Sequence, residues 1–261
     1  MNWLSIKNFF CPWLSPEPQL FGRTDTGRIR PQNEDSFAIL PNLRLMMVAD
    51  GMGGHNAGEV ASNKAIESMI DLLDEHALRR ASGNKMEIQH LLINALRQSN
   101  DRIMDLAASD KKLSGMGCTF IIGLIDNKHI YTCHVGDVRA YLNNNDGWQQ
   151  ITTDHTYAAD FEKTMAVTMG KDDNIKAPAR NIVSRAVGFP FKEDPECHCL
   201  PVKSGDRLLL CSDGLWSMMA DLRLHEIIAQ SATPEEACDL CISEANAGGG
   251  RDNITAAISF I

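Results

Sequence analysis

The hydrophobic pattern of this chain changes its period twice, and these changes limit the folds that the chain can adopt. Residues 20–51 contain short apolar runs separated by turn residues, a pattern that is typical of strands. Apolar residues then recur at spacings of three and four in residues 57–73 and 86–108, which predicts two helices. Strand-like runs return at 117–125 and 129–137. Because strands and helices do not alternate regularly, the pattern favours a layered α+β sandwich over a parallel doubly wound sheet.

Each of the two predicted helices has an apolar face that should be buried. The face of the first helix consists of Val60, Ala61, Ala65, Ile66, Met69, Ile70 and Leu73. The face of the second consists of Ile88, Leu91, Leu92, Ala95, Leu96, Ile103 and Leu106. Near the C-terminus, Thr233 followed by Glu236 predicts the capped start of a further helix, and residues 253–261 have the pattern of a strand.

Length and charge describe an ordinary globular protein. The 261 residues suit one large domain, and we expect an N-terminal extension at 1–19, loosely ordered, before a single domain at 20–261. The net charge of −9 argues against a nucleic-acid partner, because duplex binding depends on basic groups. No apolar run reaches the roughly 18 residues that span a bilayer, and the N-terminus makes a poor secretory signal. We therefore expect a cytoplasmic monomer without a transmembrane segment.

The eight cysteines fit a reducing compartment and leave a zinc site as a weaker alternative. The pairs Cys197/Cys199 and Cys238/Cys241 could supply four thiolates. Neither pair lies in a glycine-rich knuckle, and the second falls within a helical pattern. A structural zinc ion is therefore disfavoured.

Five short segments combine acidic residues with glycine or asparagine. They are residues 30–35, 50–55, 136–139, 212–214 and 251–253. Asp50 and Asp213 end nearly continuous apolar strands, so each carboxylate should emerge at a sheet edge, where the following glycine lets the chain turn sharply. Oxygen donors of this kind, without histidine or thiolate pairs, suit magnesium or manganese better than zinc. Because a single Asp-Gly pair is usually only a turn, the interpretation depends on how many such segments occur together.

The order of the segments resembles that of the metal-dependent protein serine/threonine phosphatases of type 2C, in their compact bacterial form. The matching segments are GRIRPQNEDSF, VADGMGGHNAGEVAS, GMGCTF, HVGDVRAYL, ITTDH, IVSRAVG, GDRLLLCSDGLW and GGGRDNITAAI. They extend from about Gly22 to Ile258, which is nearly the whole chain. The resemblance implies a four-layer α-β-β-α sandwich, in which two mostly antiparallel sheets are flanked by helices.

The resemblance also implies a metal site. Two divalent cations, Mn²⁺ or Mg²⁺, would be held by Glu34, Asp50, the carbonyl of Gly51, Asp213 and Asp252. Among these ligands, Asp50 would bridge both cations.

Further residues receive supporting roles from the same resemblance. Asp35, acting through a water, and Asn253 would lie behind the ligands. Arg30 matches a phosphate-binding arginine and His55 a proposed general acid. Asp137, together with Asp213, matches a third and weaker metal site, and residues 154–183 correspond to a variable flap beside the active site.

The implied function is the hydrolysis of phosphoserine and phosphothreonine in proteins, by a water that bridges the two cations. The substrates would be proteins phosphorylated by a serine/threonine kinase. Cys118, Val138 and Ser184 replace the family's usual threonine, serine and threonine, but none of them is an implied ligand.

Two alternatives compete with this interpretation. A catalytically silent phosphatase-fold binding module would typically have lost metal-binding acids, whereas every implied ligand is present in this sequence. A nuclease or pyrophosphatase with two metals is disfavoured by the order of the segments, and the nuclease also by the acidic charge.

Overall fold

The computed structural model describes residues 17–54, 57–168, 179 and 182–261 of the chain. Its strands are β1 (Gln19–Asp25), β2 (Asp35–Leu40), β3 (Leu45–Met52), β4 (Gly117–Asp126), β5 (His129–Val135), β6 (Arg139–Asn144), β7 (Gly147–Gln150), β8 (Glu196–Pro201), β9 (Arg207–Cys211) and β10 (Ile254–Phe260). Its helices are α1 (Ala57–Leu72), α2 (Glu75–Ala81), α3 (Lys85–Ser109), α4 (Tyr157–Thr168), α5 (Asp213–Trp216), α6 (Asp221–Gln230) and α7 (Pro234–Ala247), with short 3-10 helices η1 (Pro41–Leu43) and η2 (Lys111–Leu113).

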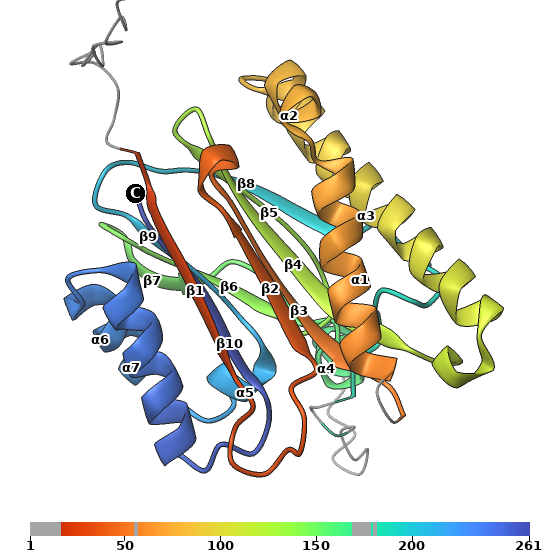
Figure 1. Ribbon diagram of the computed structural model, residues 1–261. Coiled ribbons are helices and arrows are strands. Elements are labelled where there is room, and N and C mark those ends of the chain that lie inside the picture. Colours follow the sequence, from red (N-terminus) through yellow and green to blue (C-terminus); the bar gives the residue numbers. More distant parts are fainter. Residues whose placement is uncertain (1–16, 55–56, 169–178, 180–181) are drawn as a thin grey trace, which may run out of the picture.

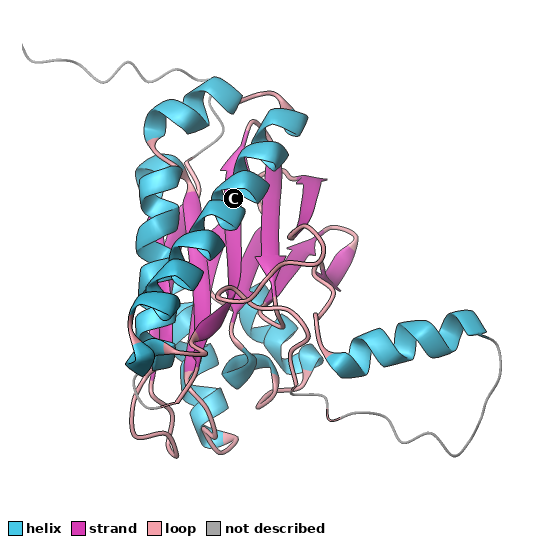
Figure 2. Cartoon of the chain, turned by 90° about the vertical axis from the view of Figure 1, so that its right-hand side faces the viewer, coloured by secondary structure: helices cyan, strands magenta, loops and turns pink. Residues whose placement is uncertain are grey.

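The strands form two antiparallel sheets that pack face to face (Figure 1). One sheet has the order β1-β10-β9-β6-β7 and the other the order β2-β3-β4-β5-β8. Helices α1, α2 and α3 cover the outer face of the second sheet, and α6 and α7 cover the outer face of the first (Figures 1 and 2). The predicted four-layer α-β-β-α sandwich is therefore confirmed.

Strand β3 shows why the sequence contains long apolar runs. Its side chains alternate, so that Leu45 and Met47 pack against the helices while Met46 and Val48 pack between the two sheets. Because both faces of the strand are buried, no polar residue interrupts the run until Asp50 at the sheet edge. Strand β9 is built in the same way, with Leu209 facing α6 and α7 and its neighbours facing the other sheet.

Helices α1 and α3 lie close to their predicted limits. Ile70 was predicted in the buried face of α1, but 39% of its surface is exposed. The neighbouring Met69 is fully buried. Since successive residues of a helix are about 100° apart, Ile70 points past the sheet that Met69 contacts.

The segment predicted as a flap contains α4, which extends away from the sheets (Figure 2). A bridge between Thr156 and Val183 joins the two ends of this segment. Residues 169–178 and 180–181 of the flap, and residues 1–16 of the predicted extension, lie outside the described residues. Among the helices that the structure describes, none combines the length and apolar character needed to cross a membrane.

Candidate active site

The predicted metal ligands lie at one end of the two sheets. Glu34 directly precedes β2, and Asp50 lies near the end of β3, opposite Asp35 in the register of the two strands. Asp213 follows β9, and Asp252 precedes β10, the antiparallel neighbour of β9. The end of one antiparallel strand meets the start of its neighbour, so each sheet brings two acids to the same edge.

Asp35 connects the two sheets through buried hydrogen bonds. Its Oδ2 accepts from Ser212 Oγ at 2.7 Å and from Thr255 Oγ1 at 2.6 Å, and both donors belong to the other sheet. Its second oxygen, Oδ1, is buried without a hydrogen-bond partner among the described residues. Burial raises the pKa of Asp35 to about 7. A buried carboxylate oxygen that lacks a donor is an available acceptor for a water and fits a site that holds cations.

The pKa values of the ligand acids show that their carboxylates lie close together. Burial and repulsion by Asp35 and Asp213 hold the pKa of Asp50 well above its usual range. The carboxyl group of Asp50 also influences the pKa of Asp213, so the two groups are neighbours. Burial and repulsion by Asp252 raise the pKa of Asp213 to about 6, and burial raises the pKa of Glu34. Divalent cations would relieve this repulsion and favour the ionised form of each acid, so the donor set fits hard metal ions.

Glycines allow the ligand-bearing loops to pack against one another. The N–H of Gly51 donates to the carbonyl of Glu34 at 3.1 Å, and Ser62 Oγ donates to the same carbonyl at 2.6 Å. A Cβ at Gly51 would lie 2.2 Å from the carbonyl oxygen of Gly58 and 2.5 Å from that of Glu34. At Gly58, a Cβ would lie 2.9 Å from Glu34 Oε2. The segment at 58–62 thus supports Glu34, a role that the sequence alone did not reveal.

We expect Gly51→Ala to destabilise the protein by about 1–3 kcal/mol or more, because backbone atoms have to move to admit the methyl group. Gly54→Ala is the matched control, since a Cβ at Gly54 would have no neighbour within 4 Å. Urea unfolding with EDTA and with Mn²⁺ measures both effects. Gly54→Ala should change the free energy of unfolding by less than about 0.5 kcal/mol. Equal effects of the two substitutions would contradict the packing described above.

Arg30 and Asn253 lie beside the ligands. Arg30 Nη2 donates to Asp252 Oδ2 at 2.7 Å, and this hydrogen bond is the first cause of the raised pKa of Arg30. Asn253 Oδ1 accepts from the N–H of Glu34 at 2.8 Å, while its Nδ2 donates to the carbonyls of Thr26 and Gln32 at 2.9 and 2.8 Å. Asn253 therefore holds the loop that carries Arg30 against the strand that carries Asp252.

Asp137 lies between β5 and β6, and its side chain also faces the acids. It is only 4% exposed, and burial together with repulsion by Asp213 raises its pKa to about 7. Asp137 is thus close enough to Asp213 for the two carboxylates to repel each other. His55 lies outside the described residues.

A group of histidines next to these acids was not identified from the sequence. The possible ligand atoms of His134, His155 and Glu196 lie within 4.8 Å of one another. His134 and Glu196 are opposite each other on β5 and β8, and the rings of His134 and His155 stack with centroids 4.6 Å apart. Both histidines occur in segments that were matched to the family, but Glu196 carried no signal in the sequence.

The zinc alternative based on cysteines does not fit the structure. Cys197 and Cys199 lie on β8 and pack toward α3, whereas Cys238 and Cys241 belong to α7 and are buried against the first sheet. The two pairs are thus on opposite sides of the sandwich, and their thiolates do not share a site.

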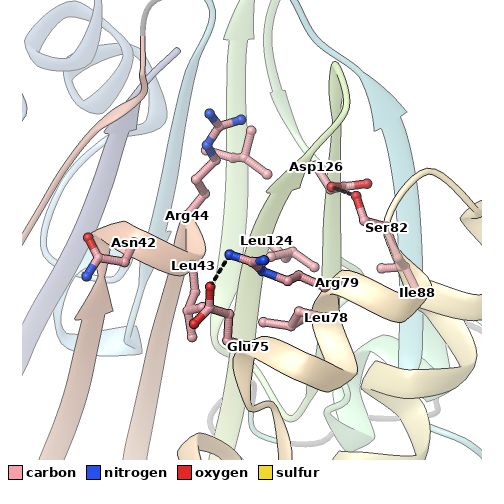
Figure 3. Close-up of a pocket in the computed structure, with 11 residues that line it drawn as sticks. Asn42, Leu43, Arg44, Glu75, Leu78, Arg79, Ser82, Ile88, Leu124 and Asp126 are labelled. Carbon is pink, nitrogen blue, oxygen red and sulfur yellow. Dashed lines mark hydrogen bonds and ion pairs between the residues drawn. The ribbon is translucent and has the colours of Figure 1, made fainter. Parts of the chain in front are cut away.

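A pocket of about 290 Å³ lies at the other end of the second sheet, between η1, α2 and the turn after β4 (Figure 3). Arg79 pairs with Glu75 at 2.5 Å and Ser82 donates to Asp126 at 2.6 Å in its wall. Because η1 joins β2 and β3 at the ends remote from the acids, this pocket is separate from the site described above.

Comparisons with known proteins agree with the geometry. The family model "Protein phosphatase 2C" matches residues 23–254. The serine/threonine phosphatase stp of Listeria innocua is 38% identical over 237 residues, which cover 89% of this chain and 92% of that protein.

Solved structures show the same fold. The serine/threonine phosphatase PstP/Ppp of Mycobacterium tuberculosis matches with a TM-score of 0.80 and 31% identity, covering 94% of this chain and 98% of the other. A structure of the catalytic domain of PstP in complex with two manganese ions matches with a TM-score of 0.78 and 30% identity, covering 93% of this chain and 97% of the other.

Proposed function

This chain belongs to the protein phosphatase 2C family and is a metal-dependent serine/threonine phosphatase. We propose that its two divalent cations are held by Glu34, Asp50, Asp213, Asp252 and the carbonyl of Gly51. The observation that carries the proposal is the meeting of these carboxylates from two different sheets, at a point where burial and repulsion by neighbouring acids raise the pKa values of Glu34, Asp50 and Asp213. Four acidic side chains also balance the charge of two divalent ions.

The bound cations supply a water activated near neutral pH and neutralise charge on the phosphate. The ligand residues fix where the cations sit, and the paired strands behind Asp50 and Asp213 keep these carboxylates in place. The unpartnered Oδ1 of Asp35 can accept a hydrogen bond from a water beside the ligands.

Arg30 binds the phosphate of the substrate in this proposal. Its guanidinium offers several N–H donors in a planar arrangement that matches two phosphate oxygens. Among the described residues, the guanidinium donates to Asp252. His55 is proposed to give a proton to the departing serine or threonine oxygen, because an alkoxide is a poor leaving group and histidine titrates in the right range.

Asp137 and Asp213 are proposed to hold a third, weaker cation. The support is the burial of Asp137 and its repulsion by Asp213. This cation would be the first lost when metal is limiting, because fewer side chains of the described chain face it.

The proposed substrates are proteins that a serine/threonine kinase has phosphorylated. We also propose that the phosphatase acts as a monomer in the cytoplasm. The seven cysteines that the structure describes are all free, which is typical of proteins from a reducing compartment.

A substrate panel tests the proposed function. A phosphoserine peptide, a phosphothreonine peptide, pyrophosphate and single-stranded DNA are each incubated with Mn²⁺ or with EDTA. We expect hydrolysis of the two phosphopeptides with Mn²⁺ alone, and Asp213→Ala should abolish it. Cleavage of pyrophosphate or DNA in preference to both peptides would assign a different hydrolase, and no hydrolysis of any substrate would favour the silent binding module.

A further inference from the structure

His155 forms hydrogen bonds with both the backbone N–H and the carbonyl of Gly136, the residue before Asp137. The N–H of His155 donates to the carbonyl of Gly136 at 2.9 Å, and the N–H of Gly136 donates to His155 Nδ1 at 3.1 Å. Gly136 has a φ of +104°, and a Cβ there would lie 2.4 Å from Thr119, the register partner of Asp50. The backbone that carries Asp137 is therefore fixed between His155 and the strand next to Asp50.

Glu196 lies beside the other ring nitrogen of His155, at ion-pair distance but without a hydrogen bond. Because Nδ1 accepts a hydrogen bond, the neutral ring carries its proton on Nε2, which lies 3.5 Å from Glu196 Oε2. The other oxygen of Glu196 contacts His198 Nε2 at 2.7 Å. Burial raises the pKa of Glu196, but its contacts with His155 and His198 lower it by more, so Glu196 remains ionised.

These residues have the side chains of a zinc site, but the hydrogen bond from Gly136 occupies one of the two ring nitrogens of His155. A metal ligand needs a free lone pair on its nitrogen. In His155 the Nδ1 lone pair is taken by Gly136 and Nε2 carries the proton, so the neutral ring offers no free lone pair. His134 stacks flat against this ring, and burial lowers the pKa of His134 to about 4, which leaves it uncharged near neutral pH. The cluster is therefore a packed support.

The carbonyl of Asp137 is held by Trp216, which Asp154, the residue next to His155, supports through Arg139. Trp216 Nε1 donates to the carbonyl of Asp137 at 3.0 Å, and the guanidinium of Arg139 lies 3.6 Å from the centroid of the Trp216 ring. Arg139 in turn donates to both oxygens of Asp154, at 2.9 and 2.6 Å. Asp154 and His155 thus act on the two sides of Asp137.

We propose that His155, oriented by Glu196, is a positioning residue that holds the carboxylate of Asp137 toward Asp213 through the backbone of Gly136. This inference rests on the proposed function, because it takes Asp137 as a metal ligand. It assigns to His155 a role in metal affinity without any contact between His155 and the metal or the substrate.

The test compares two substitutions that differ in the hydrogen bond to Gly136. His155→Leu removes the acceptor, and we expect the weakest Mn²⁺ binding step to lose about 10-fold to 100-fold in affinity, the range typical of residues behind metal ligands. His155→Asn keeps an acceptor oxygen near the position of Nδ1 and should recover most of this loss. His129→Leu is the matched control, because His129 begins β5, at the end remote from Gly136. This variant should bind Mn²⁺ as the unaltered protein does. Calorimetric titration measures binding without requiring turnover.

A double-mutant cycle separates positioning from a general structural role. In an Asp137→Asn background, His155→Leu should change neither Mn²⁺ binding nor phosphopeptide turnover further, because its effect passes through Asp137. Losses that add, or equal losses in His155→Leu and His155→Asn, would overturn the proposal. If His155→Leu does not fold, Glu196→Gln takes its place in the cycle, and we expect the same dependence on Asp137. Inactivity of the unaltered protein toward phosphopeptides would refute the proposed function, whereas an active protein with an additive cycle refutes only the positioning role.

Discussion

Asp50→Asn should make the metal-free protein more stable while it strongly reduces Mn²⁺-dependent hydrolysis. In EDTA the Asp50 carboxylate is repelled by Asp35 and Asp213, and its raised pKa shows that the fold opposes its charge. A neutral amide of nearly the same shape removes this repulsion. We expect the free energy of unfolding at pH 7.5 to rise by on the order of 1 kcal/mol, the usual size of the effect of one substitution. Turnover with Mn²⁺ should fall by on the order of 10²–10³-fold or more, because charge stabilisation at the reacting centre is lost.

Asp105→Asn is the control for this result. Asp105 lies on the exposed side of α3, so its substitution should change neither stability nor turnover measurably. Urea unfolding in EDTA and phosphopeptide assays in Mn²⁺ give the two readings for each variant. If Asp50→Asn lowered the stability of the metal-free protein and left turnover intact, Asp50 would be a structural acid rather than a metal ligand.

The metal-free protein should lose stability as the pH rises, and Mn²⁺ should reverse this trend. The pKa values of Asp35 and Asp137 are about 7 and that of Asp213 is about 6, whereas an aspartate in the unfolded chain has a pKa of about 3.9. Because the folded-state values are raised, the stability that these groups contribute is complete below about pH 4 and is lost as the pH rises through 6 and 7. The loss is up to about 4 kcal/mol for the most shifted group.

Thermal unfolding at pH 5, 6, 7 and 8 measures this linkage in EDTA and in Mn²⁺. Mn²⁺ requires ionised ligands, so its stabilising effect should grow with pH and protons should be released on binding. Asp137→Asn should flatten the pH dependence in EDTA, because it removes one of the titrating groups. A metal-free protein whose midpoint rises steadily from pH 5 to pH 8 would show that these acids do not meet in the folded chain.

The strands β3 and β9 could be predicted because both of their faces are buried, which produces long apolar runs in the sequence. The helices α1 and α3 could be predicted because they are long enough to show the helical spacing of apolar residues. Helix α2 was missed since its seven residues span only about two turns, although Asp74 caps it by accepting from the N–H of Ala77 at 2.7 Å. The predicted cap at Thr233 is present, with the N–H of Glu236 donating to Thr233 Oγ1 at 3.1 Å. The side chain of Glu236 accepts from Ala232 rather than Thr233, so the capping box is only half formed.

The candidate site was harder to predict than the fold. Strand ends followed by glycine showed that Asp50 and Asp213 emerge at sheet edges, but no spacing rule brings together acids of two different sheets. The order of family segments supplied that step. Glu196 could not be found at all, because it follows His155 by 41 positions and comes near it through the pairing of β5 with β8, which places Glu196 opposite His134.

Strand β10 has a consequence for how the protein is made. It lies between β1, the first strand of the chain, and β9, and it follows directly after Asp252. While a ribosome is still producing residues 254–260, the first sheet has an open slot, and two of its strands expose unpaired edges. A nascent chain can therefore close its first sheet only after Asp252 and the strand that follows it have been made.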